Sequence, residues 1–251
     1  MLPLEREQRI LEILDAQKTV STEELSHLLG VSEMTVRRDL ERCHREGKLQ
    51  RCHGGASVVP KTVMETDYGL KIAKRMDVKR ELAKAAAALV KPGMTVYLDA
   101  GTSTYCLAQE ICLIPDLTVI TNDLKIALLL QGSEAEVIVL GGKLQKRTGS
   151  MLGGSALQQL QSLRATIAFI GAASIDDQLE TLTPTEEKVS LKQTIRSISQ
   201  YCYLIADASK FSSFALYAIA PLSSFDGVIT DAAFTEAQKQ IIGKKTLIIR
   251  P

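Results

Sequence analysis

The sequence has no run of 18 consecutive apolar residues, and acidic residues near its start precede the first apolar segment. A membrane-spanning helix and a secretory signal peptide each require such a run, so neither is expected. The five cysteines are scattered and include no Cys-x-x-Cys pair, which argues against a disulfide framework or a zinc site. We therefore expect a cytoplasmic protein with no membrane partner, no metal site and no cofactor.

The chain also lacks a large excess of charge, since its 251 residues carry a net charge of +1. Positive charge is nevertheless concentrated between Met34 and Ala56, where six basic residues stand against three acidic ones. A local excess of this kind is what the neutralisation of DNA phosphates requires. Its position within the first quarter of the chain suggests a small nucleic-acid-binding domain followed by a larger one.

The first 60 residues show the pattern of a winged helix-turn-helix. Apolar residues at helical spacing predict helices over residues 4–17, 21–30 and 32–44, with serines at the starts of the second and third. Gly30 suits the tight turn between the last two helices. Residues 48–56 form a short alternating run that ends in a glycine pair, which predicts a hairpin that would serve as the wing.

In this motif the last helix lies in the major groove, with its N-terminal residues over base edges. Arg37 and Arg38 are adjacent and so point about 100° apart. We expect one to reach a base edge or the groove wall and the other to pair with a phosphate, with Asp39 orienting one of them. The predicted DNA contacts are Ser21, Thr22, Ser32, Met34, Thr35, Arg37, Arg38, Lys48, Arg51, His53, Gly54 and Gly55.

One long contiguous segment carries a family resemblance. It reads Leu25-Ser26-x-Leu28-Leu29-Gly30-Val31-Ser32-x-Met34-Thr35-Val36-Arg37-Arg38-Asp39-Leu40 and is followed by His53-Gly54-Gly55-Ala56. With these residues the chain resembles the DeoR family of bacterial transcriptional regulators. The resemblance implies a repressor of a carbohydrate catabolic operon that binds double-stranded operator DNA and is released by a phosphorylated sugar or sugar derivative. Because helix-turn-helix proteins read paired half-sites, we expect a homodimer or homotetramer.

The remainder of the chain predicts an α/β domain. Residues 58–77 show no clear period and predict a linker between a DNA-binding domain at 1–57 and an effector-sensing domain at 78–251. Short apolar runs then alternate with helical segments, which is typical of a mostly parallel sheet with helices on both faces. Strands are predicted at 95–98, 117–120, 136–140, 167–170, 202–205, 227–229 and 246–249, and helices at 79–90, 103–112, 123–131, 155–163, 185–199 and 235–242.

Polar and glycine-containing loops follow several of these strands. The carboxyl ends of parallel strands share one edge of a sheet, where ligands bind. The loop at residues 99–104 suits an anion, because small residues, hydroxyls and a helix N-terminus meet there, although the Gly-Lys-Thr of a P-loop is absent. The loops supply most of the predicted effector contacts, namely Asp99, Gly101, Thr102, Ser103, Thr104, Thr121, Asn122, Gly141, Gly142, Lys143 and Lys210.

The family resemblance extends through this second domain, because the DeoR sensor domain is similar to ribose-5-phosphate isomerase. It implies that Glu187, Lys192 and Lys210 are charged residues of the effector pocket, and Asp176 completes the predicted effector set. The chain departs from the family at residues 179–183, which read Leu-Glu-Thr-Leu-Thr where members commonly have Gly-Leu-Thr.

A second departure concerns catalysis. After the strand that ends at residue 170, where the isomerase pattern places acidic residues, the chain has Ala173 and Ser174. A proton-shuttling isomerase needs a positioned carboxylate base, so we expect no catalytic residues and a protein that senses its ligand. The alternative is an active sugar-phosphate isomerase-like enzyme that carries a DNA-binding appendage, and it requires turnover of pentose or hexose phosphates.

Overall fold

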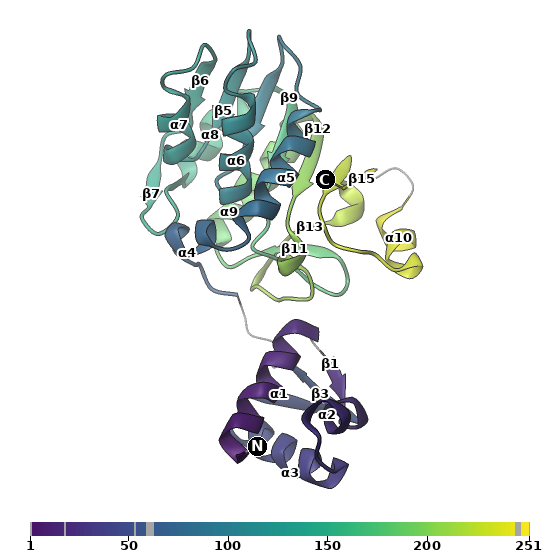
Figure 1. The fold of residues 1–251 in the computed structure, drawn as a ribbon. Helices are drawn as coiled ribbons and strands as arrows, with labels where there is room; N and C mark the ends of the chain where they lie inside the picture. The colour runs from purple at the N-terminus through teal and green to yellow at the C-terminus, as the bar shows by residue number, and fades with distance from the viewer. Residues whose placement is uncertain (1, 18, 53, 59–62, 244–246, 251) are drawn as a thin grey trace. The chain divides into compact units, whose positions relative to one another are not determined.

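The computed structural model describes residues 2–17, 19–52, 54–58, 63–243 and 247–250 (Figure 1). The chain divides into two compact units, Met1–Lys61 and Thr62–Pro251. His53, one of the predicted DNA contacts, lies outside the described residues, as does the first residue of the predicted strand at 246–249. None of the described helices combines the length and apolarity that crossing a bilayer requires.

The first unit is a winged helix-turn-helix, as predicted. Its described residues form α1 (Pro3–Gln17), α2 (Thr22–Leu29) and α3 (Glu33–Arg45) with an antiparallel sheet of order β1-β3-β2, formed by β1 (Thr19–Ser21), β2 (Leu49–Cys52) and β3 (Gly55–Val58). One buried apolar cluster joins all three helices to the sheet and includes Ile10, Leu25, Val36 and Leu40. β1 was not predicted, because three residues are too few to show an alternating pattern.

The backbone of this unit requires glycine at two positions. Gly30 ends α2 in the left-handed conformation, at φ 64°, which lets the chain turn into α3. A Cβ on Gly55 would lie 2.2 Å from the carbonyl oxygen of Val20, because β3 passes close to β1 at this point. No larger residue fits at position 55 without moving one of these two strands.

The second unit is built on a sheet whose seven described strands all pair in parallel, in the order β15-β14-β12-β9-β4-β5-β6 (Figure 1). The strands are β4 (Thr95–Leu98), β5 (Thr118–Thr121), β6 (Glu136–Val139), β9 (Ala165–Ile170), β12 (Ser199–Ile205), β14 (Gly227–Ile229) and β15 (Leu247–Ile249). These are the seven predicted strands. The predicted α/β fold class is therefore confirmed.

Helices cover both faces of this sheet. α5 (Met76–Ala87), α6 (Thr102–Ile111) and α7 (Leu124–Leu130) pack on one face, while α8 (Gly154–Gln161), α9 (Glu186–Ile198) and α10 (Glu236–Ile242) contribute to the core on the other. Successive side chains of a strand point to opposite faces. Accordingly, Val96 and Leu98 of β4 enter the first core, and Tyr97 enters the second.

Five short strands outside the large sheet were not predicted. β7 (Lys143–Gln145) pairs with β8 (Ser150–Leu152), and β10 (Ser174–Ile175), β11 (Glu180–Thr183) and β13 (Tyr217–Pro221) form an antiparallel sheet. In the β10–β11 turn, buried Leu179 has φ 63°, a conformation that favours glycine. This is where the chain departs from the Gly-Leu-Thr of the family that it resembles.

Part of the segment that its sequence assigns to the linker packs against the second unit. Residues 63–75, which we call the strap, include α4 (Tyr68–Ala73) and lead into α5. The backbone N–H of Val63 donates to the carbonyl of Phe214 at 2.6 Å, and that of Tyr68 donates to the carbonyl of Arg147 at 2.9 Å. The strap therefore packs on the second unit and separates it in sequence from the winged helix-turn-helix.

Candidate functional site

The N-terminal part of α3 is arranged to present side chains to a partner. Ser32 caps the helix, its hydroxyl accepting a hydrogen bond from the N–H of Thr35 at 3.3 Å. Met34 is 77% exposed, and Arg37 and Arg38 are also exposed. Arg38 has no hydrogen-bond or ion-pair partner among the described residues, so its guanidinium is free to bind a base or a phosphate.

Arg37 has a different environment. It pairs with Glu33 one turn earlier at 3.1 Å, and its carbonyl accepts a hydrogen bond from Arg51 of the wing strand β2 at 3.3 Å. The sequence predicts different roles for these two arginines without saying which has which, and the structure shows that their surroundings differ. Within the described part of the chain, the Arg38 side chain has no partner, whereas Arg37 already holds an exposed ion pair with Glu33.

The expectation that Asp39 orients one of these arginines is wrong. Asp39 is 1% exposed and faces the core side of α3, where it pairs with Arg6 of α1 and lies 3.5 Å from Arg42. Its hydrogen bond raises the pKa of the Arg6 guanidinium, against the effect of burial. Asp39 sits three residues after buried Val36 and four before buried Cys43, spacings that place it on the inner side of the helix.

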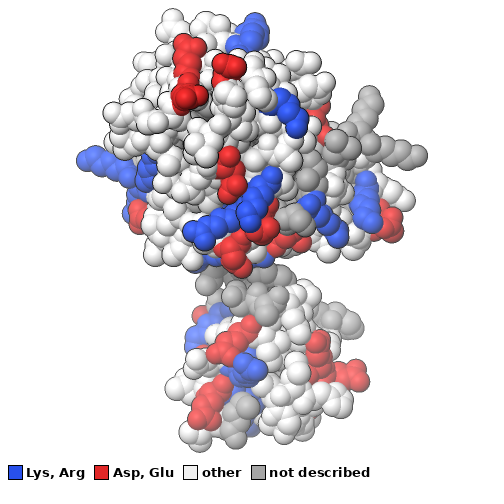
Figure 2. Space-filling view, turned by 45° about the horizontal axis from the view of Figure 1, so that its top comes forward, with Lys and Arg blue, Asp and Glu red and all other residues white. Residues whose placement is uncertain are grey.

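Several of the other predicted DNA contacts have partners within the first unit. Ser21 caps α2 by accepting from the N–H of Glu24 at 3.0 Å, and Thr22 is 4% exposed with its N–H donating to the carbonyl of Gly54. Lys48 pairs with Glu7 and Glu46. On the face drawn in Figure 2, basic and acidic side chains are interspersed.

In the second unit, two of the predicted effector residues, Asp99 and Lys192, meet at the backbone of Gly171, between the ends of β4 and β9. Strand order reverses here, since β5 and β6 lie on one side of β4 while β9, β12, β14 and β15 lie on the other. Such a switch point is where open α/β sheets bind ligands. Asp99, which follows β4, accepts from the N–H of Gly171 at 3.0 Å and pairs with Lys192 of α9, which also donates to the Gly171 carbonyl at 2.7 Å.

The loop after β4 is held by internal hydrogen bonds. The Thr104 hydroxyl donates to the carbonyls of Asp99 at 2.6 Å and Gly101 at 3.0 Å. The Asn122 side chain accepts from Tyr97 Oη and from the Ala100 N–H, both at 3.1 Å, and the Thr121 hydroxyl donates to the Leu98 carbonyl at 2.8 Å. These predicted contacts are brought together, but their side chains position the loop. Thr102 is buried and Ser103 half-buried at the start of α6.

Other predicted effector residues are placed elsewhere. Asp176 accepts from the N–H groups of Gln178 and Glu180 in the β10–β11 turn, and Glu187 is exposed on the first turn of α9. Gly141, Gly142 and Lys143 lead into β7, and a Cβ on Gly142 would lie 2.4 Å from the Leu152 carbonyl oxygen. Their positions give packing or turn roles to Asp176 and Gly142.

Cations gather along the same edge of the sheet. Burial lowers the pKa of Lys210, which Asp207 opposes and which the nearby Lys71, Lys79 and Lys74 reinforce. Arg75 bridges the carboxylates of Asp207 and Asp231, which follow β12 and β14. Lys79 is 3% exposed and donates to the carbonyls of Lys71 and Lys74, which fixes the strap to α5.

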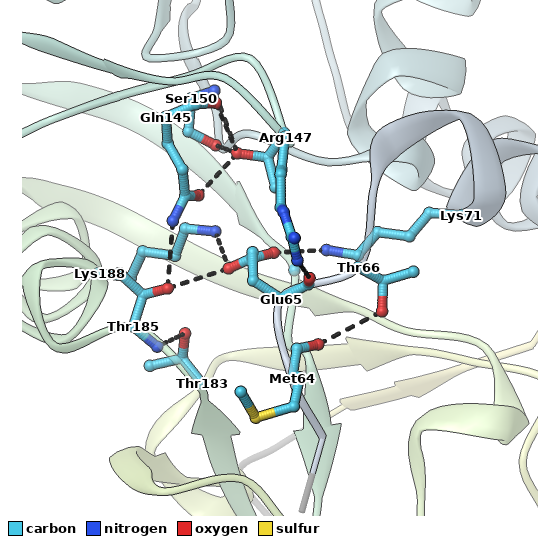
Figure 3. Close-up of polar contacts among 12 residues, drawn as sticks. Met64, Glu65, Thr66, Lys71, Gln145, Arg147, Ser150, Thr183, Thr185 and Lys188 are labelled. Carbon is cyan, nitrogen blue, oxygen red and sulfur yellow. Dashed lines mark hydrogen bonds and ion pairs between the residues drawn. The ribbon is translucent and has the colours of Figure 1, made fainter.

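Glu65 of the strap is enclosed by basic and hydroxyl groups (Figure 3). One carboxylate oxygen lies 2.7 Å from Lys71 Nζ, and the other lies 2.7 Å from Lys188 Nζ and 3.0 Å from the Thr185 hydroxyl. Arg147 donates to the Glu65 carbonyl at 3.3 Å. Burial raises the pKa of this carboxyl, but the two lysines outweigh it and bring the pKa down to about 2.

We expect Glu65→Gln to destabilise the second unit in a pH-dependent way. Because the pKa of Glu65 falls from 4.5 to about 2 on folding, its contribution is complete above pH 4.5 and is lost as the pH falls toward 2. The variant should lose on the order of 1–3 kcal/mol above pH 5, and the difference from the unsubstituted protein should narrow between pH 4.5 and pH 3.

The measurement is the urea midpoint followed by tyrosine fluorescence, since all six tyrosines lie in the second unit. Asp67→Asn is the control, because it removes a carboxylate that is exposed on the same strap. A midpoint difference that stays constant down to pH 3 would show that Glu65 is not ionised in this cluster.

The sequence did not point to most of the residues around Glu65 and around Arg75, namely Glu65, Lys71, Arg75, Lys79, Arg147, Thr185, Lys188 and Asp231. The strap shows no period, so nothing in it pointed to a folded element. One usable signal was the spacing of Lys188 and Lys192, four residues apart and hence on one face of α9. Among the described residues, no group of three or more His, Cys, Asp or Glu side chains could hold a metal ion.

Comparison with known proteins identifies the family. Residues 6–62 match the DeoR-like helix-turn-helix domain, and residues 74–232 match the DeoR C terminal sensor domain. The chain is 38% identical over 248 residues to the HTH-type transcriptional regulator YgbI of Escherichia coli K12, covering 98% of this chain and 97% of the relative. It is 30% identical over 233 residues to the glycerol-3-phosphate regulon repressor of the same organism, covering 92% of each.

Among solved structures, a ribose 5-phosphate isomerase A from Methanocaldococcus jannaschii matches 55% of each chain with a TM-score of 0.40 and 19% identity, a likeness too weak to bear on function. The relatives named above are transcriptional regulators and repressors, which supports a DNA-binding regulator, as predicted, and not an enzyme. The chain belongs to the DeoR family of transcriptional regulators.

Proposed function

We propose that this regulator represses a carbohydrate catabolic operon and is released from its operator by a phosphorylated sugar or sugar derivative. The observation that carries the effector half is the loop at the switch point, where α6 begins at Thr102 beside the buried ion pair of Lys192 with Asp99. Small residues and hydroxyls at a helix N-terminus favour an anionic ligand. A relative named as the glycerol-3-phosphate regulon repressor supports the same ligand class.

The proposal includes a homodimer or homotetramer in the cytoplasm. Two winged helix-turn-helix units would read two half-sites of a palindromic operator, and the effector would change their relative arrangement. For that to happen, the effector must bind the DNA-free form more tightly than the DNA-bound form. A coupling of 1–3 kcal/mol is typical and corresponds to about 5–150-fold in operator affinity.

The direct test is an electrophoretic mobility shift with the DNA upstream of the protein's own gene cluster. We expect a retarded complex at moderate salt that dissociates on addition of one member of a sugar-phosphate panel, while the matching unphosphorylated sugar has no effect. No retardation would overturn the DNA-binding half of the proposal. Retardation that no sugar phosphate alters would overturn the effector half.

We expect Arg38→Ala to weaken operator binding by about 5–150-fold, because a good base contact is worth 1–3 kcal/mol of discrimination. Arg38 is exposed near the start of α3. Its side chain has no partner among the described residues, so its removal breaks no described contact within the protein. Arg45→Ala is the matched control, since it removes the same charge from the last turn of the same helix. Titration of specific and scrambled duplexes measures both.

For Arg38→Ala, affinity for the specific duplex should fall toward that for the scrambled one. For Arg45→Ala, both affinities should fall together or stay unchanged, because a phosphate contact carries no sequence information. Equal losses for the two variants on the specific duplex would remove Arg38 from the set of base-reading residues.

A further inference from the structure

We propose that Glu65 is an internal anion that occupies a phosphate-binding site formed by Lys71, Lys188 and Thr185, and that a phosphate monoester binds there by displacing it. This inference rests on the proposed function, and it assigns the effector's charged group to residues outside the set predicted from sequence. It also assigns a consequence to binding, since Glu65 belongs to the strap.

The donors around Glu65 suit a tetrahedral oxyanion. Two ammonium groups, at 2.7 Å each, and one hydroxyl, at 3.0 Å, converge on its carboxylate from different directions (Figure 3). The Thr185 hydroxyl is itself held from the other side by the side-chain amide of Gln145 at 3.3 Å. Three donors match the three terminal oxygens of a phosphate monoester, whereas a carboxylate has only two oxygens to offer.

Electrostatics require an anion at this place. The side chain of Lys188 is 12% exposed, and burial together with the nearby Lys192 and Lys71 lowers its pKa, while Glu65 opposes the shift. A buried ammonium without an anionic partner is strongly unfavourable. Glu65 can therefore leave only when another anion takes its place, and a phosphate monoester carries about 1.5 to 2 negative charges at pH 7 against one for the carboxylate.

The position of Glu65 in the chain links this exchange to the winged helix-turn-helix. Val63 and Glu65 are attached at the start of the strap, and the next ion pairs along it are those of Arg75 with Asp207 and Asp231. Between them, the Tyr68 ring lies 4.1 Å from Lys125 Nζ, measured to its centroid, and its buried hydroxyl has no hydrogen-bond partner among the residues that the structure describes. Displacement of Glu65 thus removes the ion pair that joins the start of the strap to α9.

The test uses inorganic phosphate and the full-length protein. Isothermal titration should give a dissociation constant for phosphate at least about tenfold lower in Glu65→Gln than in the unsubstituted protein, because the internal competitor no longer holds the site. Asp67→Asn, which removes an exposed strap carboxylate, should leave the constant unchanged. Glu65→Gln combined with Lys188→Met should lose the gain, and the tyrosine fluorescence of each variant verifies that the second unit is folded.

Hydrogen exchange of the backbone amides of residues 63–68 reports on the start of the strap independently. Exchange at these amides should accelerate in Glu65→Gln and, in the unsubstituted protein, on addition of phosphate. Phosphate binding that is equal in the two proteins, or weaker in the variant, would overturn the inference, and so would exchange that phosphate does not change.

The two levels of proposal fail separately. If a sugar phosphate releases the operator while Glu65→Gln gains no phosphate affinity, the inference about Glu65 is wrong and the proposed function stands. If Glu65→Gln gains phosphate affinity and its strap opens while no sugar phosphate affects the operator complex, the anion site stands and the proposed effector class is wrong.

Discussion

Asp39→Ala should destabilise the first unit by about 3–5 kcal/mol, because it breaks a buried ion pair by removing the carboxylate that the Arg6 guanidinium binds. Arg6 is 6% exposed and Asp39 is 1% exposed, so water cannot replace the lost partner. The measurement is hydrogen exchange of the backbone amides of α1 and α3, which reports on this unit separately from the second one. Operator binding should weaken in parallel, since α3 is presented only by the folded unit.

Two controls separate the buried pair from charge removal in general. Glu33→Ala breaks the exposed Arg37–Glu33 pair of the same helix and should cost no more than about 1 kcal/mol. The double variant Arg6→Met with Asp39→Leu replaces the pair by apolar side chains of similar size and should recover most of the stability. A cost below about 1 kcal/mol for Asp39→Ala would mean that the pair is hydrated.

Lys192→Met should have a comparable effect on the second unit, about 3–5 kcal/mol, and should also abolish the response to the effector. The substitution leaves Asp99, 2% exposed, without a cation at the switch point. Adding Asp99→Asn to Lys192→Met should restore most of the stability, because the uncompensated charge is gone, yet the double variant should remain unresponsive. Urea unfolding followed by tyrosine fluorescence measures the stability.

Lys239→Met is the matched control for this experiment. Lys239 pairs with Glu236 at the surface, with side chains 46% and 84% exposed, so its loss should cost no more than about 1 kcal/mol. If Lys192→Met and Lys239→Met behave alike, the pair at the switch point is not a desolvated one. If the double variant regains its response to the effector, Lys192 supports the fold and does not contact the ligand.

The large sheet and its helices could be predicted because its strands read as short apolar runs, and the central strands are buried on both faces. Residues 95–98 and 202–205 show this directly. The small sheet could not be predicted, since strands such as Ser174–Ile175 are too short for a period. The positive φ of Leu179 could not be predicted either, because leucine rarely adopts this conformation. Burial of its side chain outweighs the backbone cost.

The residues of the candidate sites could be predicted to different extents. Capped helices with a Gly30 turn have local signatures, which is why the position of α3 was predicted correctly. The partner of Asp39 was not, because Arg6 is 33 residues away and the pair depends on how α1 crosses α3. Glu65 and Lys188 are separated by 123 residues, and only the folded second unit brings them together.

Lys188 and Lys192 lie one turn apart on α9, which spans Glu186–Ile198. One of them holds the strap through Glu65, and the other holds the ends of β4 and β9 through Asp99 and Gly171. A helix of this length moves as a rigid rod, about 6 Å separating residues four apart along its axis. Because both lysines extend from adjacent turns of one helix, a shift of α9 would move the attachment of the strap and the attachment of the strand ends together.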